Sequence, residues 1–211
     1  MRIGADEAGK GPVLGSMFAA AVRAPATAIP DAIDDSKRLS PARREALAAD
    51  LRADDRVAVG LGEIPVERID GEEDMNTLTV AAQAEAVAAV ARDGDGGVLD
   101  AGDTSADRFA RRVAGRVPAD VDLRAEHGAD ETYLLVGAAS VIAKVERDAH
   151  VARLAETYGE VGSGYPSDPT TREFLRAYVE AVGELPDCAR RSWSTSDDVL
   201  AAAEQSALDS F

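Results

Sequence analysis

An acidic pair near the N-terminus is the feature with the clearest chemical capacity. Asp6 and Glu7 are adjacent at the end of a short apolar start, and a glycine-rich turn over residues 9–12 follows them. Adjacent carboxylates repel one another, which raises their pKa unless a cation neutralises them. Mg²⁺ and Mn²⁺ are hard cations that favour such oxygen ligands. The pair therefore predicts a divalent-metal site, with a solvated acidic surface as the plainer alternative.

The same stretch also matches most of a phosphate-binding loop, G-x-x-x-x-G-K-[ST], from Gly4 to Lys10. Position 11 is glycine, so the hydroxyl that would hold magnesium is missing. Asp6 and Glu7 would lie where phosphates bind, and residues 1–3 leave little room for the preceding strand. We therefore exclude a phosphate loop.

Two further carboxylates follow later strands of the expected fold. Asp100 ends a very short strand at residues 98–99, and Asp130 follows a strand at residues 121–125. Sites gather at strand ends in α/β sheets, so all four acids are expected to face one point, which bound cations would make tolerable.

Each of these later residues also has a structural interpretation. Asp100 would then only begin a loop, and Asp130 would cap a helix that starts at Glu131. His127 is a candidate base, but a lone histidine in a loop is more often structural. The sequence alone leaves these alternatives open.

The elements that must position these residues form an α/β pattern. We expect strands at residues 2–7, 13–23, 56–64, 98–99 and 121–125. We expect helices at residues 76–92, 105–115, 131–158, 170–182 and 197–204, and one that begins at Pro41 with Ser40 as its cap. The prediction is a mixed five-stranded sheet flanked by helices, with a helical C-terminal extension.

Composition places the chain among soluble proteins with an aliphatic core. Hydrophobic residues make up 45% of the 211 residues and aromatic residues only 4%, so Ala, Val, Leu and Ile must fill the core. The single cysteine, Cys188, has no partner for an internal disulfide, which fits a reducing compartment. No apolar run approaches the roughly 18 residues of a membrane span, and acids at position six argue against a signal peptide. We expect a cytoplasmic protein.

The net charge of −16 argues at first against a nucleic-acid partner. Only three lysines accompany twenty arginines, a balance that we expect of a cytoplasm at molar salt. There the Debye length is about 3 Å, so distant charges hardly repel. Partner binding must then depend on local contacts and metals.

Five blocks of the sequence carry a family resemblance. They are Ile3–Gly15 (IGADEAGKGPVLG), Asp35–Leu39 (DSKRL), Glu126–Asp130 (EHGAD), Ala138–Lys144 (AASVIAK) and Gly162–Asp168 (GSGYPSD). Together they resemble ribonuclease HII, the type 2 ribonucleases H, in order and over nearly the whole chain. The form is similar to the archaeal one, and the charge indicates a halophile.

The resemblance implies an RNase H-like fold and a set of site residues. Asp6, Glu7, Asp100 and Asp130 match the four metal-binding carboxylates, which would hold two Mg²⁺ or Mn²⁺ ions, with Asp6 bridging them. The positions that match substrate-binding residues are Gly9, Lys10, Gly11, Lys37, Ser140, Lys144 and Tyr165.

The implied roles of these substrate-binding positions differ. The Gly9–Gly11 backbone would sense the ribose 2′-hydroxyl, which separates RNA from DNA. Tyr165 would stack on the adjoining deoxyribose. Lys10 stands where arginine is usual in the family and Gly128 where lysine is usual, which keeps charge at the first position and removes it at the second.

The implied activity is endonucleolytic cleavage of the RNA strand of RNA·DNA hybrids and of the 5′ side of single ribonucleotides in duplex DNA. The products would carry 5′-phosphate and 3′-hydroxyl ends, as in primer removal and ribonucleotide excision repair. We expect a monomer with a catalytic core at residues 1–158 and a substrate-binding extension at residues 159–204. The alternatives are an inactive sliding-clamp interaction protein and another nuclease of this fold, such as a resolvase.

The last seven residues form a separate signal. Gln205, Leu208 and Phe211 fit Q-x-x-h-x-x-aromatic, the pattern by which replication proteins bind the sliding clamp. One aromatic residue is present where two are usual. The tail at residues 205–211 is therefore either a clamp-binding segment or a frayed end.

Overall fold

A computed structural model describes residues 1–33 and 39–208. Lys37 and Phe211, two of the predicted site residues, lie outside the described residues, as does the side chain of Leu208. The strands are β1 (Arg2–Ala8), β2 (Met17–Ala24), β3 (Ala58–Ile64), β4 (Asp95–Asp100) and β5 (Val121–Glu126). The helices are α1 (Pro41–Ala53), α2 (Val66–Ile69), α3 (Met75–Ala88), α4 (Ala106–Ala114), α5 (Leu134–Tyr158), α6 (Pro169–Val182) and α7 (Ser194–Leu208), with 3-10 turns η1 (Ala26–Ala28) and η3 (Ala129–Glu131).

The five strands form one mixed sheet in the order β3-β2-β1-β4-β5, which confirms the predicted architecture. β1 pairs antiparallel with β2 and parallel with β4, and β5 continues the parallel half. β1 and β4 therefore end at the same edge of the sheet. Asp6, Glu7 and Asp100 are brought to that edge by this pairing alone.

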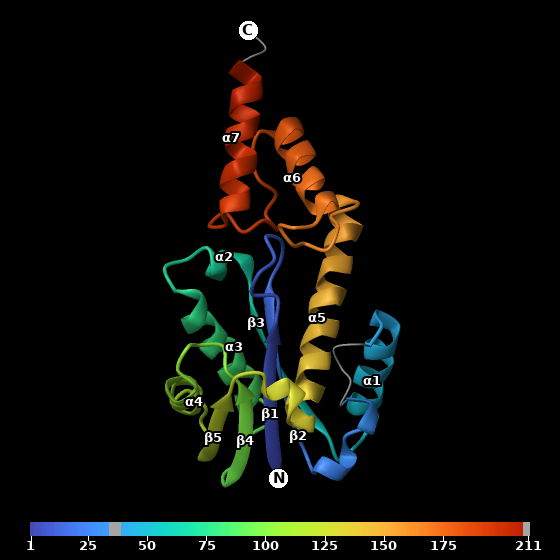
Figure 1. The fold of residues 1–211 in the computed structure, drawn as a ribbon, viewed down its shortest axis with the longest axis vertical. Helices are drawn as coiled ribbons and strands as arrows, with labels where there is room; N and C mark the ends of the chain where they lie inside the picture. The colour runs from blue at the N-terminus through green and yellow to red at the C-terminus, as the bar shows by residue number, and fades with distance from the viewer. Residues whose placement is uncertain (34–38, 209–211) are drawn as a thin grey trace.

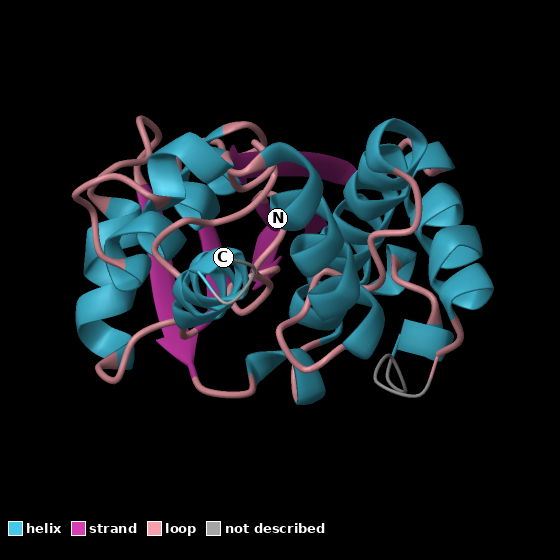
Figure 2. Ribbon diagram, turned by 90° about the horizontal axis from the view of Figure 1, so that it is seen from above, coloured by secondary structure: helices cyan, strands magenta, loops and turns pink. Residues whose placement is uncertain are grey.

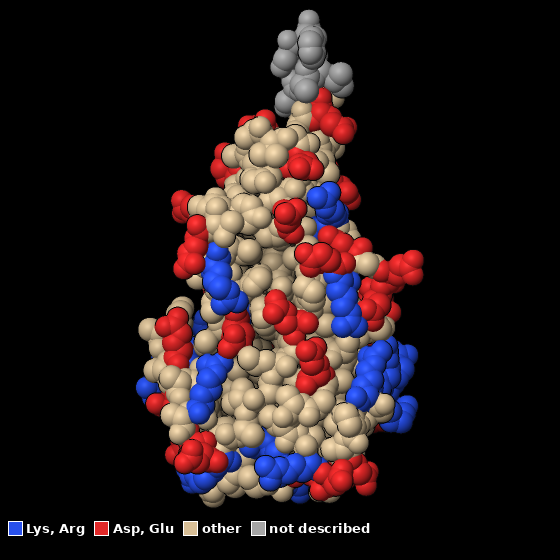
Figure 3. Space-filling view, turned by 180° about the vertical axis from the view of Figure 1, so that it is seen from behind, with Lys and Arg blue, Asp and Glu red and all other residues tan. Residues whose placement is uncertain are grey.

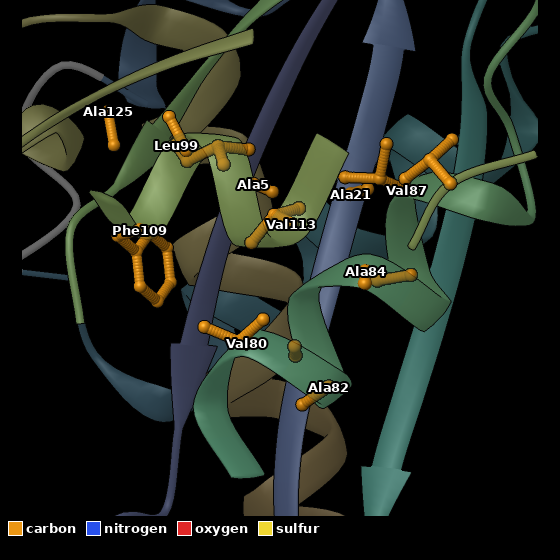
Figure 4. Packing of buried hydrophobic residues seen from close by; sticks show 14 of the residues in the cluster. Ala5, Ala21, Val80, Ala82, Ala84, Val87, Leu99, Phe109, Val113 and Ala125 are labelled. Carbon is orange, nitrogen blue, oxygen red and sulfur yellow. The ribbon is translucent and has the colours of Figure 1, made fainter. Parts of the chain in front are cut away.

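Helices cover both faces of the sheet (Figure 1, Figure 2). α3 and α4 pack on one face through a hydrophobic cluster that includes Leu99, Phe109 and Val113 (Figure 4). α5 packs on the other face against β1 and β2, and α1 packs against α5. With so few aromatic residues, close contact depends on small side chains: a Cβ on Gly60 or Gly62 of β3 would lie 2.0–2.2 Å from carbonyl oxygens of α3.

Gly4 sets how closely α5 approaches the central strand. A Cβ built on Gly4 would lie 2.3 Å from the carbonyl carbon of Leu135 and 2.4 Å from the amide nitrogen of Val136. Only glycine permits this contact, because any side chain would collide with helix backbone. The N-terminal half of α5 is thereby held against β1, where Asp6 lies.

The C-terminal part shares a third hydrophobic cluster with the N-terminal segment. Val13 and Leu14 are fully buried among residues of α6, α7 and the second half of α5. Their amides both donate to the carbonyl of Gly164, at 2.8 and 3.2 Å. The loop after β1 thus reaches up to the base of α6 and α7 (Figure 1). Among the described residues, no helix has the length and apolarity that a membrane span requires.

Several element boundaries differ from the predictions. β4 runs from Asp95 to Asp100 rather than over residues 98–99 alone, β3 begins at Ala58 rather than Arg56, and α3 ends at Ala88 rather than Arg92. β2 begins at Met17 rather than Val13, because residues 13–15 bond to the C-terminal part and Gly15 turns with φ +78°. α5 begins at Leu134 rather than Glu131, because η3 comes first. α7 runs from Ser194 to Leu208 and includes the first part of the predicted tail. The N-cap of α1 is Ser40, as predicted, with its hydroxyl accepting from the amide of Arg43.

Candidate active site

The acidic pair lies at the end of the central strand, with its two side chains on opposite faces of the sheet. Successive residues of a strand point to opposite sides. Asp6 faces α5, where the Ser140 hydroxyl donates to it, and Glu7 faces α3. Asp6 is only 6% exposed, and burial raises its pKa, with the charges of Glu7 and Asp100 raising it further. Such a carboxylate is costly unless a cation compensates it.

Glu7 is held on its own face by two donors. Gln83 of α3 donates from Nε2 to Glu7 Oε2 at 2.5 Å, and Lys10 Nζ lies 3.5 Å from Glu7 Oε1. Burial raises the pKa of Glu7, while Lys10 and Gln83 act in the opposite direction. Lys10 also donates to the carbonyl of Gly102 at 3.1 Å. The lysine of the glycine loop is thus directed back toward the carboxylates.

Asp100 and Asp130 lie at the neighbouring strand ends. Asp100 ends β4, and its Oδ1 accepts from the amide of Ala129 at 2.7 Å. This bond ties the end of β4 to η3, which carries Asp130. Burial raises the pKa of Asp100, and the charge of Asp130 adds to that rise. Each of the four acids therefore interacts with at least one other.

The four carboxylates do not converge on a single point. Within residues 1–33 and 39–208, no three acidic, histidine or cysteine side chains stand in an arrangement that would hold one ion. The oxygens of Glu7 are directed to Gln83 and Lys10, and Asp100 is directed to the amide of Ala129. The donor set is nevertheless that of a hard divalent cation: buried carboxylates with raised pKa values at one sheet edge. The chemistry of these residues therefore fits such a group.

An open cavity of about 460 Å³ lies beside this edge. Both Glu7 and Asp100 line it, and Lys10 and His127 contribute the basic groups on its wall. His127 is exposed there, and its charge lowers the pKa of Asp100. A phosphodiester backbone entering this cavity would meet the carboxylates directly.

Ser140 and Lys144 lie on α5 one turn apart, facing Asp6. Lys144 Nζ donates to Ser140 Oγ at 2.8 Å, and the Ser140 hydroxyl in turn bonds to Asp6. Residues four apart share one face of a helix. The chain from lysine through hydroxyl to carboxylate places a positive charge near the acids without neutralising them directly.

The two glycine-rich loops meet although more than 150 residues separate them. A Cβ on Gly11 would lie 3.7 Å from Cε1 of Tyr165, in ordinary contact. Arg147 of α5 holds this arrangement: its guanidinium lies 5.2 Å from the Tyr165 ring centroid and donates to the carbonyl of Ser163 at 3.1 Å. The aliphatic part of Arg147 would also touch a Cβ on Gly9, at 3.3 Å. Gly9, Gly11 and Tyr165 therefore border one surface.

The structural alternative for Asp130 does not hold. α5 has Tyr133 at its N-cap position, so Asp130 is not the cap of that helix. Asp130 lies instead inside η3, which follows Gly128 in a left-handed conformation with φ +67°. The alternative for Asp100 stays open, because Asp100 does begin a loop and that loop ends at Ser105, the N-cap of α4, whose hydroxyl accepts from the amide of Arg108.

The comparisons with known proteins agree with this arrangement. The family model described as Ribonuclease HII matches residues 3–196. The chain belongs to the ribonuclease HII family. It is therefore an endonuclease of the ribonuclease H type, and the resemblance found in the sequence is confirmed.

Relatives of this family cover the chain from end to end. Ribonuclease HII of Haloarcula marismortui is 68% identical over 212 residues, with both chains covered completely. The crystal structure of ribonuclease H2 from Pyrococcus horikoshii OT3 is 33% identical with a TM-score of 0.88, covering 97% of this chain and 99% of that one. A structure of the PCNA:RNase HII complex from Archaeoglobus fulgidus is 35% identical with a TM-score of 0.80, covering 94% and 96%.

Sequence reasoning missed the residues that orient the side chains of the site through hydrogen bonds and ring contacts. Gln83 and Arg147 have no local motif, and each acts through contacts across the fold. The one available signal was Gln83 itself, a polar residue on the inward face of an alanine-rich helix.

The face opposite to the view of Figure 1 carries acidic side chains scattered among basic ones (Figure 3). Among the residues that the structure describes, this face therefore shows no continuous basic surface for a nucleic acid.

Proposed function

We propose that this chain cleaves the RNA strand of RNA·DNA hybrids and the 5′ side of single ribonucleotides in duplex DNA. The observation that carries the proposal is the position of the buried pair Asp6 and Glu7 beside the surface formed by Gly9, Gly11 and Tyr165. A site that hydrolyses a phosphodiester thus borders a surface suited to reading a sugar. Primer removal and ribonucleotide excision repair are the processes that need this combination.

In this reaction, the residues of the chain bind the metal ions and position the substrate. We assign Asp6, Glu7, Asp100 and Asp130 as the residues that hold Mg²⁺ or Mn²⁺. When bound, two such ions supply an activated water and stabilise the charge on the leaving oxygen. The oxygen of water joins phosphorus, the bond from phosphorus to the 3′ oxygen breaks, and that oxygen takes up a proton. A 5′-phosphate and a 3′-hydroxyl remain.

The glycine loop and Tyr165 confine this reaction to ribonucleotides. The loop has no side chain at Gly9 or Gly11, so a ribose can approach its backbone closely. Backbone amides are donors for the 2′-hydroxyl oxygen, which DNA lacks. The Tyr165 ring, held by Arg147, offers a flat surface for the adjoining deoxyribose. Ser140 and Lys144 provide polar groups for the substrate backbone on the opposite side.

Cleavage assays test the proposal directly. The substrates are a labelled RNA·DNA hybrid, a DNA duplex with one ribonucleotide, and the same duplex without it, each with Mg²⁺ or Mn²⁺ at several salt concentrations. We expect the first two to be cut and the third to remain intact. Asp6→Asn should abolish cleavage with the fold intact, whereas Asp50→Asn, an exposed acid on α1, should cleave like the wild type. Near wild-type cleavage by Asp6→Asn at saturating metal would refute the assignment.

The same assay separates the competing functions. An inactive interaction protein would cut none of the three substrates, and a resolvase-like nuclease would cut DNA without a ribonucleotide. Either pattern would replace the proposal.

We also propose that the C-terminal tail binds the sliding clamp through Gln205, Leu208 and Phe211. The support is the sequence pattern together with the Archaeoglobus fulgidus relative, whose structure is a complex with PCNA. Gln205 lies in the last turns of α7. Deletion of residues 208–211, or Phe211→Ala alone, should abolish binding to the clamp in surface plasmon resonance, with Ser210→Ala as the matched control. Clamp affinity that survives the deletion would leave a frayed end as the correct interpretation.

A further inference from the structure

Arg190 is a fully buried arginine whose partners are backbone oxygens. It lies in the loop between α6 and α7, and its side chain is 0% exposed. Its guanidinium donates to the carbonyls of Gly9 at 2.6 Å, Lys10 at 2.9 Å and Gly15 at 2.9 Å. Burial lowers the pKa of Arg190 to about 10. A buried charge is expensive, so its retention needs a reason beyond ordinary packing.

Trp193 completes the set of contacts to the glycine loop. Its Nε1 donates to the carbonyl of Gly11 at 3.3 Å, and its ring lies 4.8 Å from the guanidinium carbon of Arg190. Three consecutive carbonyls of the loop, those of residues 9, 10 and 11, are thereby all bonded to the same short segment. That segment is fixed in turn by Asp70, which accepts from the amides of Arg191 at 2.7 Å and Ser192 at 3.0 Å.

These contacts determine where the loop's amides point. In a trans peptide the N–H of one residue is directed opposite to the C=O of the residue before it. When Arg190 holds the carbonyls of Gly9 and Lys10, the amides of Lys10 and Gly11 must face away from Arg190. Neither amide has a hydrogen-bond partner among the residues that the structure describes. Gly11 is also the residue that borders Tyr165.

We infer that Arg190, with Trp193, is a positioning residue for ribonucleotide recognition, which turns the amides of Lys10 and Gly11 outward toward the 2′-hydroxyl of the substrate. The inference rests on the proposed function and deepens it. It gives the loop between α6 and α7 a role in substrate specificity, because residues of that loop hold the carbonyls of residues 9–11. Gly9, with φ +93°, gives the backbone the freedom that the arginine then removes.

The variants that test this inference remove the donors in steps. Arg190→Met keeps the length and packing of the side chain and removes every donor. Arg190→Lys keeps the charge but offers a point donor in place of a fork, so it cannot reach three carbonyls with the same geometry. Trp193→Phe keeps the ring beside Arg190 and removes only the bond to Gly11. Arg191→Met is the matched control, because the Arg191 side chain is exposed one position away.

Two measurements separate positioning from general stability. The first is hydrogen exchange of the peptide that covers residues 8–16, without substrate. The second is the affinity ratio between a duplex with one ribonucleotide and the same all-DNA duplex, measured by anisotropy with every variant carried on Asp6→Asn to prevent cleavage. Steady-state kinetics of the same variants with Asp6 intact give kcat and KM separately. A variant that only lost stability would show a lower melting temperature and an unchanged ratio in its folded fraction.

We expect Arg190→Met to bring the affinity ratio close to one and to lower kcat on the order of 100-fold, because small misplacements of a positioning group have effects of that size. Arg190→Lys should fall between Arg190→Met and wild type. Trp193→Phe should reduce the ratio about fivefold, the equivalent of one ordinary hydrogen bond. Exchange in residues 8–16 should become faster in all three and stay unchanged in Arg191→Met.

Unchanged ratios and unchanged exchange in folded Arg190→Lys and Trp193→Phe would overturn the inference, and these two variants decide if Arg190→Met does not fold. A wild-type chain that neither cuts nor prefers the ribonucleotide duplex would instead overturn the proposed function. In that case, slower exchange of residues 8–16 in the wild type than in the variants would still establish that Arg190 orders this loop. The role in ribonucleotide recognition would nevertheless be overturned.

Discussion

Gln83 donates a hydrogen bond of 2.5 Å from its side-chain amide to Glu7, and the same nitrogen donates to the carbonyl of Asp100 at 3.0 Å. One fully buried amide on α3 thus joins the ends of β1 and β4. The orientation of Glu7 depends on this bond, because among residues 1–33 and 39–208 the other side-chain partner of this carboxylate is the flexible Lys10.

Removal of this amide should weaken metal binding without unfolding the protein. Residues that orient a metal-binding carboxylate typically affect metal affinity or activity 10- to 100-fold. We expect Gln83→Met to reduce Mn²⁺ affinity by about that factor, measured by titration calorimetry. Glu85→Met, an exposed position on the same helix, is the control. Equal Mn²⁺ affinity in the wild type and Gln83→Met would show that Glu7 needs no such support.

Gly11→Ala should separate substrate recognition from folding. The added Cβ would lie 3.7 Å from Tyr165, which is ordinary contact, so the melting temperature should change by no more than a few degrees. The methyl group would stand on the surface where we propose that the ribose binds. We expect kcat/KM for the single-ribonucleotide duplex to fall at least 10-fold, by analogy with other misplacements at a reacting centre. Unimpaired cleavage would place the ribose elsewhere.

Gly4→Ala, in contrast to Gly11→Ala, should lower the stability of the fold. Its Cβ would lie 2.3–2.6 Å from backbone atoms of Leu135 and Val136, and helix backbone cannot rotate away as a side chain can. Overpacking of a core typically costs about 1–3 kcal/mol, and a collision with backbone belongs at or above the upper end. Chemical denaturation with urea measures the change in the free energy of unfolding. A cost below about 0.5 kcal/mol would mean that α5 tolerates a wider separation from β1.

His150 should contribute a loss of stability as the pH decreases below about 6.5, opposite in sign to the contributions of Asp6 and Glu7, whose raised pKa values favour the folded state at lower pH. Its Nε2 accepts from the amide of Ser16 at 3.2 Å, so the neutral ring is the bonded form. Burial lowers the pKa of His150 below its usual value of 6.5, with Arg153 and Arg190 adding to this and Glu63 opposing it. At His150, the unfolded chain then binds more protons than the folded one just below pH 6.5. The stability that this residue contributes is therefore lost as the pH falls through that range.

Urea denaturation at pH 7.5, 6.5 and 5.5 checks this dependence. His150→Gln removes the titrating ring, so the slope of its unfolding free energy against pH over these values should be lower than that of the wild type. An identical slope in the wild type and His150→Gln would assign the dependence to other groups.

Where the sequence carried a local signal, the prediction of the fold was close. Ser40 before Pro41 marked the start of α1, and the two acids at the end of an apolar strand were placed correctly at the sheet edge. The start of β2 was wrong for a physical reason: residues 13 and 14 are as apolar as a strand, but the amides of residues 13–15 donate to the carbonyls of Gly164 and Cys188. Apolar composition does not say which neighbour will satisfy the backbone.

The support of the site was beyond prediction because it depends on contacts between distant parts of the chain. Arg190 stands in a stretch that reads as an ordinary polar loop, and nothing within ten residues of it identifies the carbonyls that it binds. Gln83 lies in an alanine-rich helix whose inward face becomes known only when β1 and β4 are paired. Residue type and spacing predict the groups that could do chemistry, but the residues that orient these groups required the three-dimensional structure.

The bonds from Arg190 and Trp193 to residues 9–11 connect positions 180 to 182 apart in the chain. During synthesis, the N-terminal segment therefore leaves the ribosome long before its anchors exist. A nascent chain that already carries all four acids still lacks Arg190 and Trp193, so the backbone carbonyls of residues 9–11 gain these hydrogen bonds only after residue 193 has been made.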